Sequence, residues 1–434
     1  MNPDHISAYF LETFFQFYET DRKISIGYED SSNADIIIFQ GNLSFFKETK
    51  AIPKYFIWHS WKDKDIPFLF DQEEKQDVIT VEKENVRINY DIIASVFYFL
   101  SHWQEIHQTE TDKYGRFPYQ NSIQYHYDFA LLPVVNYYFD ILKAAIEKTG
   151  VNIQRKQQIA PIQVFLSHDI DNLSSGWLEN IFAELKRGNL LKTYSILKNK
   201  WKGKDPWDNL DDILELEKQL GVVSTYFFLP REGNGNADYK LEKATPWFDH
   251  IRQANSEVGL HGSLNSAFDD AQFQADLDEF SQPIVGNRFH FLKFSANTTP
   301  HILDQTDILY DASHGFAEHI GFRSGFCYPY QPFNFSTNRA HKHWQIPLLL
   351  MDTTLRNPSY MGKEPANSIE TKIDTLIEEI ALFDGVLSIL WHNTYFSESK
   401  FAGWHERYVS LIKKLKNKGA AFYTGEEIIE WIHE

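Results

Sequence analysis

The chain has 434 residues, and its 42 Lys and Arg against 60 Asp and Glu give a formal net charge of −18 at pH 7. This acidity argues against a nucleic-acid partner and against docking on anionic lipid, because both need a basic surface. The single cysteine, Cys327, excludes an intramolecular disulfide framework, and no apolar run approaches the roughly 18 residues that cross a bilayer, so we expect no stable membrane insertion.

The first 150 residues predict a small mixed α+β domain. Apolar runs bounded by polar turns indicate strands, and longer apolar segments indicate buried helices. The expected elements are strands at 34–39, 78–81 and 86–90, a helix at 92–106 capped by Asp91, and a helix at 131–146. The polar stretch 147–158 is the predicted linker to a second domain over residues 158–434.

From residue 161 onward, apolar strand-like runs alternate with amphipathic stretches. This alternation predicts parallel strands joined by crossover helices, in an open sheet or in a (β/α) barrel. We favour a barrel, since polar residues suited to chemistry follow several of these strands and the active sites of barrels form at the carboxyl ends of their strands. Open doubly wound sheets place their sites at the same ends, so they are the alternative.

The first of these strand ends carries two carboxylates. It reads Ser167-His168-Asp169-Ile170-Asp171, and residues i and i+2 of an extended chain face the same side. In one pocket, one carboxylate can bind a cation while the other acts as a base. The alternative is an acidic turn whose aspartates cap the next helix.

Two further strands end in histidines. His261 follows an apolar strand, and Asn265 lies four residues on, one turn away if a helix starts there. His392 ends the run at 387–391. A lone histidine is more often structural, but a site assembled from separate barrel strands needs long separations, such as the 90 residues from Asp171 to His261. Motifs of serine hydrolases, P-loop proteins and zincins are missing from the sequence.

Several of these motifs occur in the order of the polysaccharide deacetylase family, the carbohydrate esterases with NodB homology. They are Asp169-Ile170-Asp171, His261 with Ser263, Arg288 and His392, and the resemblance covers residues 160–430. It implies a distorted (β/α) barrel and a divalent metal, typically zinc but cobalt or nickel in some members. The motifs YGRFP, GFRSGFCYPYQPF and LWHN resemble a subgroup with a mixed domain ahead of the catalytic one.

The resemblance implies a role for each matching residue. Asp169 matches the general base, Asp171 the metal-binding aspartate and His261 the first metal histidine. The remaining matches are Arg288 for the arginine that orients the base, His392 for the general acid, and Asp311 for an acid that tunes this histidine.

Two departures from the family pattern bear on the metal. The position four residues after His261 is commonly a second histidine and here is Asn265, whose amide oxygen is a weaker zinc ligand than imidazole. Either Asn265 coordinates, or His168 or His290 takes its place, or the metal has been lost. The family's adjacent aspartates are also spread into Asp-Ile-Asp.

We therefore expect a metal-dependent hydrolase that removes an acyl group, most simply acetyl, from an amino sugar or glycan precursor. The candidate substrate-binding residues are Ser263, His290, Trp391 and Tyr328. Because no basic, apolar leader opens the chain, we expect a cytoplasmic protein with a small-molecule or glycan substrate. The alternatives are a metal-independent amidohydrolase of the same fold that acts on a small non-sugar amide, and a non-catalytic glycan-binding protein.

The aromatic content of 16% suits deep cores and sugar-stacking clefts alike. In the first domain, Arg116, Trp103 and Tyr119 are candidates for a lid or a substrate-recognition surface. The competing interpretation is that these side chains pack against the barrel.

Overall fold

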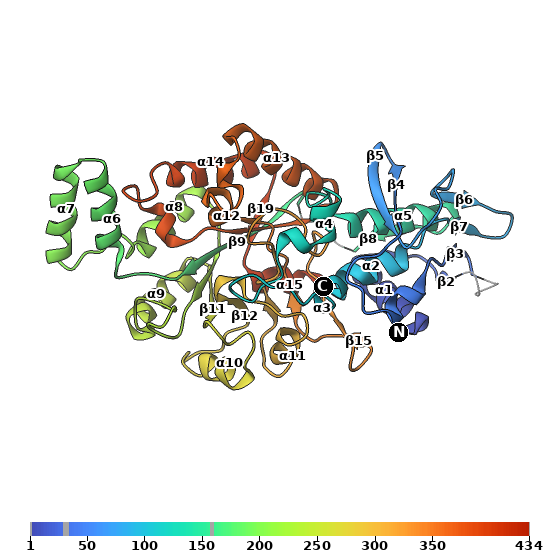
Figure 1. The fold of residues 1–434 in the computed structure, drawn as a ribbon, viewed down its shortest axis with the longest axis horizontal. Coiled ribbons are helices and arrows are strands. Elements are labelled where there is room, and N and C mark those ends of the chain that lie inside the picture. The colour runs from blue at the N-terminus through green and yellow to red at the C-terminus, as the bar shows by residue number, and fades with distance from the viewer. Residues whose placement is uncertain (1, 29–33, 157–159, 434) are drawn as a thin grey trace.

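A curled parallel sheet forms the larger part of the computed structural model, which describes residues 2–28, 34–156 and 160–433 (Figure 1). Its strands are β9 (Gln163–Ile170), β10 (Thr225–Phe228), β11 (Glu257–Gly262), β12 (Gly286–Phe289), β13 (Tyr310–Asp311), β16 (Trp344–Gln345), β17 (Leu350–Met351), β18 (Val386–Leu390) and β19 (Ala421–Tyr423). The order across the sheet is β16-β13-β12-β11-β10-β9-β18-β17, and β19 also pairs with β9. Every one of these pairings is parallel.

The chain between β16 and β17 closes this curl. The backbone N–H of Ile346 donates to the carbonyl of Asp311 in β13, and that of Leu349 donates to the carbonyl of Ser388 in β18. The segment therefore joins the two edge strands of the sheet, β16 and β17, and the fold is a distorted (β/α) barrel, as the alternation of strands and helices and the family resemblance led us to expect.

Helices connect the strands of the barrel (Figure 1). They are α6 (Gly176–Lys186), α7 (Leu190–Trp201), α8 (Leu210–Leu220), α9 (Leu241–Gln253), α10 (Asp270–Leu277), α11 (Thr299–Leu303), α12 (Asp352–Arg356), α13 (Ala366–Leu382), α14 (Trp404–Asn417) and α15 (Gly425–His433). The short hairpin of β14 (Phe333–Asn334) and β15 (Arg339–Ala340) precedes β16. Within the described ranges, no helix combines the length and apolar character that crossing a bilayer requires.

The N-terminal part is a mixed α+β structure beside the barrel (Figure 1). Its helices are α1 (Pro3–Phe17), α2 (Ile92–Leu100), α3 (Trp103–Ile106), α4 (Ile123–His126) and α5 (Val134–Lys148). Its strands are β1 (Tyr18–Thr20), β2 (Ile26–Tyr28), β3 (Ile36–Ile38), β4 (Phe56–Trp61), β5 (Lys64–Leu69), β6 (Ile79–Val81), β7 (Val86–Ile88) and β8 (Ile153–Arg155). The strands β2, β3, β7 and β6 form one sheet in that order, and β4 and β5 form a separate hairpin.

Two expectations for this part need correction. The helix expected at 92–106 is broken into α2 and α3, since His102 between them adopts a left-handed conformation with φ of 58°. The stretch 147–158 does not act as a free linker, because β8 within it pairs antiparallel with β1. Residues 157–159, at its end, lie outside the described residues.

The N-terminal part and the barrel share one apolar core. The ring of Phe17 at the end of α1 lies 5.8 Å from that of Phe326 and 4.7 Å from that of Tyr328. Two turns earlier in α1, the Tyr9 hydroxyl donates to the carbonyl of Gln331 at 2.8 Å. Apolar residues of both parts therefore bury each other in one large cluster, and smaller clusters lie within the barrel.

A buried ion cluster crosses the same boundary. Glu105 of α3 accepts hydrogen bonds from Arg323 Nε at 2.8 Å and Nη2 at 2.6 Å, and contacts His314 Nε2 at 2.9 Å. All three side chains are almost fully buried. Burial alone would raise the pKa of Glu105, but Arg323 and His314 outweigh it and hold this pKa well below its usual range.

We predict that Glu105→Gln destabilises the protein by about 3–5 kcal/mol, because it leaves the Arg323 charge buried without a carboxylate. Urea denaturation at pH 7 measures this loss. A carboxylate with a depressed pKa contributes stability above its unfolded pKa, here near 4.5, and loses it as the pH falls through the folded pKa. The difference in the free energy of unfolding between wild type and variant should therefore become smaller as the pH falls below 4.5.

A matched control is Glu147→Gln, since Glu147 pairs with Lys143 on the exposed side of α5. It should change the free energy of unfolding by less than about 0.5 kcal/mol. If both variants lower the free energy of unfolding by the same amount, the buried cluster does not hold the two parts together.

Candidate functional site

The carboxyl ends of the parallel strands enclose a pocket of about 240 Å³. Strand β9 brings Asp169 to it, and Asp171 directly follows this strand; β11 brings His261, the turn after β12 brings His290, and His392 follows β18. These residues are up to 223 positions apart in the chain (392 − 169). They meet because all of these strands run parallel and end at the same rim of the barrel.

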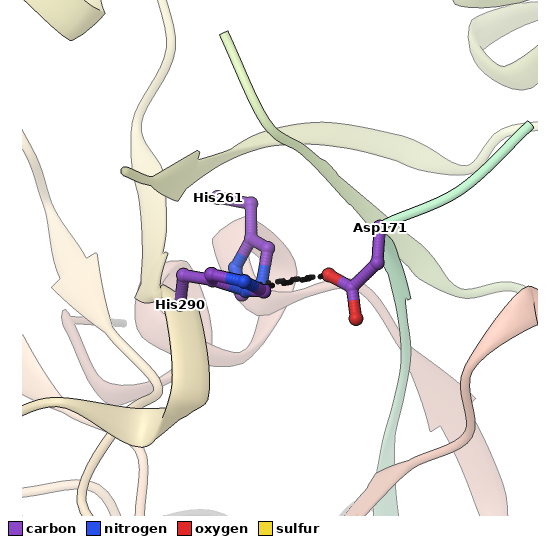
Figure 2. Close-up of side chains that lie close together, drawn as sticks. All are labelled: Asp171, His261 and His290. Carbon is purple, nitrogen blue, oxygen red and sulfur yellow. Dashed lines mark hydrogen bonds and ion pairs between the residues drawn. The ribbon is translucent and has the colours of Figure 1, made fainter. Parts of the chain in front are cut away.

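Asp171, His261 and His290 point toward a common centre (Figure 2). Asp171 Oδ1 lies 3.3 Å from His261 Nε2 and 3.4 Å from His290 Nδ1, and the two nitrogens are 3.0 Å apart. Ligand atoms about 2.0–2.1 Å from a tetrahedral zinc ion lie about 3.3 Å from one another. The three donor atoms thus have the spacing of a metal centre.

The surroundings of these donors suit a cation as well. His261 Nδ1 lies 2.7 Å from the carbonyl of Arg288, so this nitrogen carries the proton and Nε2 is free to coordinate. Burial alone would raise the pKa of Asp171, but His290 and His261 outweigh it and hold this pKa well below its usual range. The carboxylate therefore stays ionised, and the donor set fits a divalent metal.

Asn265 does not take part in this cluster. Its side chain is exposed and does not line the pocket. An i+4 partner of His261 needs a helix, but the chain after β11 forms turns, and α10 begins only at Asp270. Of the two substitutes considered, His290 lies in the cluster with Asp171 and His261, while His168 is bonded elsewhere, with Nε2 2.8 Å from a Glu217 oxygen.

Arg288 holds Asp169 in the pocket wall. Its Nη1 donates to Asp169 Oδ1 at 2.9 Å and to Ser167 Oγ at 2.8 Å, while Nε donates to the carbonyl of Ala312. Arg288 is completely buried. The other carboxylate oxygen of Asp169 lies 3.7 Å from His261 Nε2, so it faces the cluster of possible metal ligands.

His392 is oriented by Asp352, the first residue of α12. Asp352 Oδ1 lies 2.8 Å from His392 Nδ1, and Oδ2 accepts the backbone N–H of His392 at 2.6 Å. This leaves His392 Nε2 directed at the pocket, 3.9 Å from Asp171 Oδ2. Burial lowers the pKa of His392, but Asp352 and the pocket aspartates raise it to about 10.

The expected partner of His392, Asp311, is elsewhere. Its carboxylate accepts hydrogen bonds from Asn287 Nδ2, Ser313 Oγ and Gln345 Nε2, and it does not contact His392. The sequence could have identified Asp352 as a candidate site residue, because this aspartate directly follows the apolar run that ends at Met351.

Three of the four expected substrate-binding residues lie outside the pocket. Trp391 precedes His392, and because successive side chains of an extended chain face opposite sides, it packs outward against Trp404. Ser263 is buried, with its backbone N–H bonded to a carboxylate of α10. Tyr328 belongs to the core shared with α1.

The N-terminal part supplies one wall of the pocket. Tyr114 stacks on Phe291 with ring centroids 4.8 Å apart, and both line the pocket with Arg116. Arg116 Nη1 donates to the carbonyl of Phe291 at 2.8 Å. Phe291 and Leu292 have φ angles of 59° and 55°, which are strained for bulky residues, so Arg116 stabilises the turn that presents His290.

The other two candidates of this part are structural. Trp103 is buried, and its Nε1 donates to the carbonyl of Lys50. Tyr119 stacks on His319, outside the pocket. Tyr360 and Tyr395, which the sequence did not single out, line the pocket instead.

Residues 4–150 match a family model described as a family of unknown function, DUF7033. No curated protein matches the chain significantly. Solved structures match about two thirds of the chain. One is assigned to the polysaccharide deacetylases, from Mycobacterium smegmatis, with 15% identity over 63% of this chain and 91% of that chain and a TM-score of 0.42.

Two other matching structures carry different descriptions. Puue allantoinase is 16% identical over 63% of this chain and 91% of its own, with a TM-score of 0.41. A protein of Bacillus anthracis, BA3943, described as a CE4 family pseudoenzyme, is 15% identical over 62% of this chain and 65% of its own, with a TM-score of 0.29. Polysaccharide deacetylases are thus among the solved structures that match this chain.

We predict that metal binding depends on His290 and not on Asn265. His290→Ala should weaken zinc binding by about 100-fold or more, because it removes one of three protein ligands. Asn265→Ala, at the exposed position four residues after His261, should bind zinc like the wild type. Isothermal titration of metal-stripped protein measures both affinities, and the reverse order of effects would contradict this ligand set.

Proposed function

We propose that the protein is a metal-dependent hydrolase that removes an acyl group, most simply acetyl, from an amino sugar or glycan precursor. The observation that carries this proposal is the convergence of Asp171, His261 and His290 with Asp169 and His392 in one pocket. A divalent metal held by the first three residues supplies Lewis acidity toward the acyl carbonyl and the attacking water.

Asp169 is the proposed general base. Arg288 holds one of its oxygens, which leaves the other turned to the pocket to take a proton as water attacks the carbonyl carbon. The buried guanidinium also keeps this carboxylate in one orientation, so little reorganisation is needed when the proton moves.

His392 is the proposed general acid. The Asp352 carboxylate fixes its ring through Nδ1 and favours the imidazolium form. The Nε2 proton then passes to the leaving nitrogen as the carbon–nitrogen bond breaks. The products are a carboxylate, such as acetate, and a free amine.

The lining of the pocket supports a sugar substrate. A volume of about 240 Å³ is below the roughly 300–1,000 Å³ of sites that enclose drug-sized ligands, so it suits one acylated sugar residue. The stacked rings of Tyr114 and Phe291 offer an apolar face for a pyranose ring. We further propose that residues 1–150 form a recognition domain, which contributes Arg116 to the pocket wall, and that residues 158–434 form the catalytic barrel.

We predict that Asp169→Asn and His392→Ala each lower kcat by about 10²–10⁴-fold, because each removes one proton transfer. Acetate release from N-acetylglucosamine oligosaccharides and from a nucleotide-linked N-acetylated sugar measures this loss. Asn265→Ala serves as the control that keeps activity. Zinc titration of His392→Ala distinguishes the loss of an acid from the loss of the metal centre.

Two outcomes would contradict the proposal. Full activity of either variant would remove that residue from the mechanism. Sugar binding without acetate release by the wild-type protein loaded with zinc would instead favour a non-catalytic glycan-binding protein, while activity that survives complete metal removal would favour the metal-independent amidohydrolase.

A further inference from the structure

Helices α6 and α7 form a hairpin that projects from the barrel at the end farthest from the N-terminal part (Figure 1). Its exposed surface is apolar. Of the thirteen exposed large hydrophobic side chains of the described residues, seven lie on this hairpin: Leu178, Phe182, Leu185, Leu190, Leu191, Tyr194 and Trp201. Leu191 and Trp201 are 86% and 80% exposed, so these side chains are turned away from the protein.

The hairpin buries polar residues in their place. The buried positions of α6 and α7 include Asn180, Glu184 and Thr193. Asn180 Oδ1 accepts a hydrogen bond from Ser397 Oγ at 2.7 Å, which fixes α6 to the loop after β18. An ordinary surface helix shows the opposite arrangement, with apolar residues inside and polar residues outside. The apolar surface of this hairpin is therefore built for contact with something beyond the chain.

The charge of the hairpin is opposite to that of the protein. Residues 176–204 contain seven Lys and Arg and two Asp and Glu, a net charge of +5. The chain as a whole has −18, so the remainder has −23 (−18 − 5). Lysines flank the apolar side chains along α7 and just beyond it, at positions 192, 198, 200, 202 and 204.

We propose that the α6–α7 hairpin docks the protein peripherally on a bilayer that contains anionic lipid. Interfacial helices combine Trp, Phe and Leu on one face with Lys and Arg beside them, as this hairpin does. The basic residues are attracted to anionic headgroups, and the apolar side chains enter the boundary with the acyl chains. Such docking needs no membrane-spanning helix.

A second copy of the chain is a less suitable occupant. A two-fold contact brings the same surface of both copies together, so it would place two hairpins of charge +5 against each other. The expectation that the acidic chain avoids anionic lipid rests on the charge of the whole molecule, whereas the projecting hairpin by itself has a net charge of +5.

The test uses the full-length protein with two kinds of vesicle, phosphatidylcholine alone and phosphatidylcholine mixed with phosphatidylglycerol. We expect co-sedimentation with the mixed vesicles, weakened by salt as headgroup charges are screened. The triple variant Phe182→Ser, Leu191→Ser, Trp201→Ser should lower the partition coefficient by at least about tenfold. The variant Lys192→Glu, Lys198→Glu, Lys202→Glu should lose the preference for anionic vesicles.

Matched controls replace exposed apolar residues elsewhere. Val81→Ser and Leu382→Ser, at positions 60% and 64% exposed, should bind like the wild type. No binding of wild-type protein to anionic vesicles would overturn the proposal, as would binding that both hairpin variants retain. A dimer that the apolar variant abolishes, seen by light scattering without vesicle binding, would assign the surface to a second copy instead.

Discussion

The fully buried guanidinium of Arg288 connects most parts of the pocket. Its charge is balanced by Asp169, and an unpaired charge at that depth would cost several kcal/mol. The backbone carbonyl of the same residue faces His261 Nδ1, which turns the other imidazole nitrogen toward Asp171. One residue of β12 therefore fixes both the carboxylate proposed as the base and the tautomer of a proposed metal ligand, and it does so before any substrate enters.

Much of this arrangement follows from local sequence patterns. Carboxylates and histidines placed directly after apolar runs predicted a site at the carboxyl ends of barrel strands, and the structure brings Asp169, Asp171, His261 and His392 together there. The errors came from spacing and pairing. An i+4 ligand requires a helix that does not form at Asn265, and the partner of a histidine depends on which strand lies beside it, which no local pattern records.

The N-terminal part shows the limit of dividing a chain by composition. A polar stretch suggested a linker, yet the regions on either side of it share a core and an ion cluster. Arg116 reaches across to the strained turn at Phe291, so the shape of the pocket depends on both parts. The net charge is a similar case, since a chain with a net charge of −18 contains a hairpin, residues 176–204, with a net charge of +5.

The packing of α1 against the barrel also has a consequence during synthesis. Tyr9 bonds to Gln331, 322 residues later, and Phe17 packs on residues made almost as late. At about 5–20 residues per second, a ribosome needs about 15–65 s to make the intervening chain. For that time the part of α1 that faces residues 326–331 lacks its native cover, while α2 and α5, which are made earlier, already cover other apolar side chains of α1.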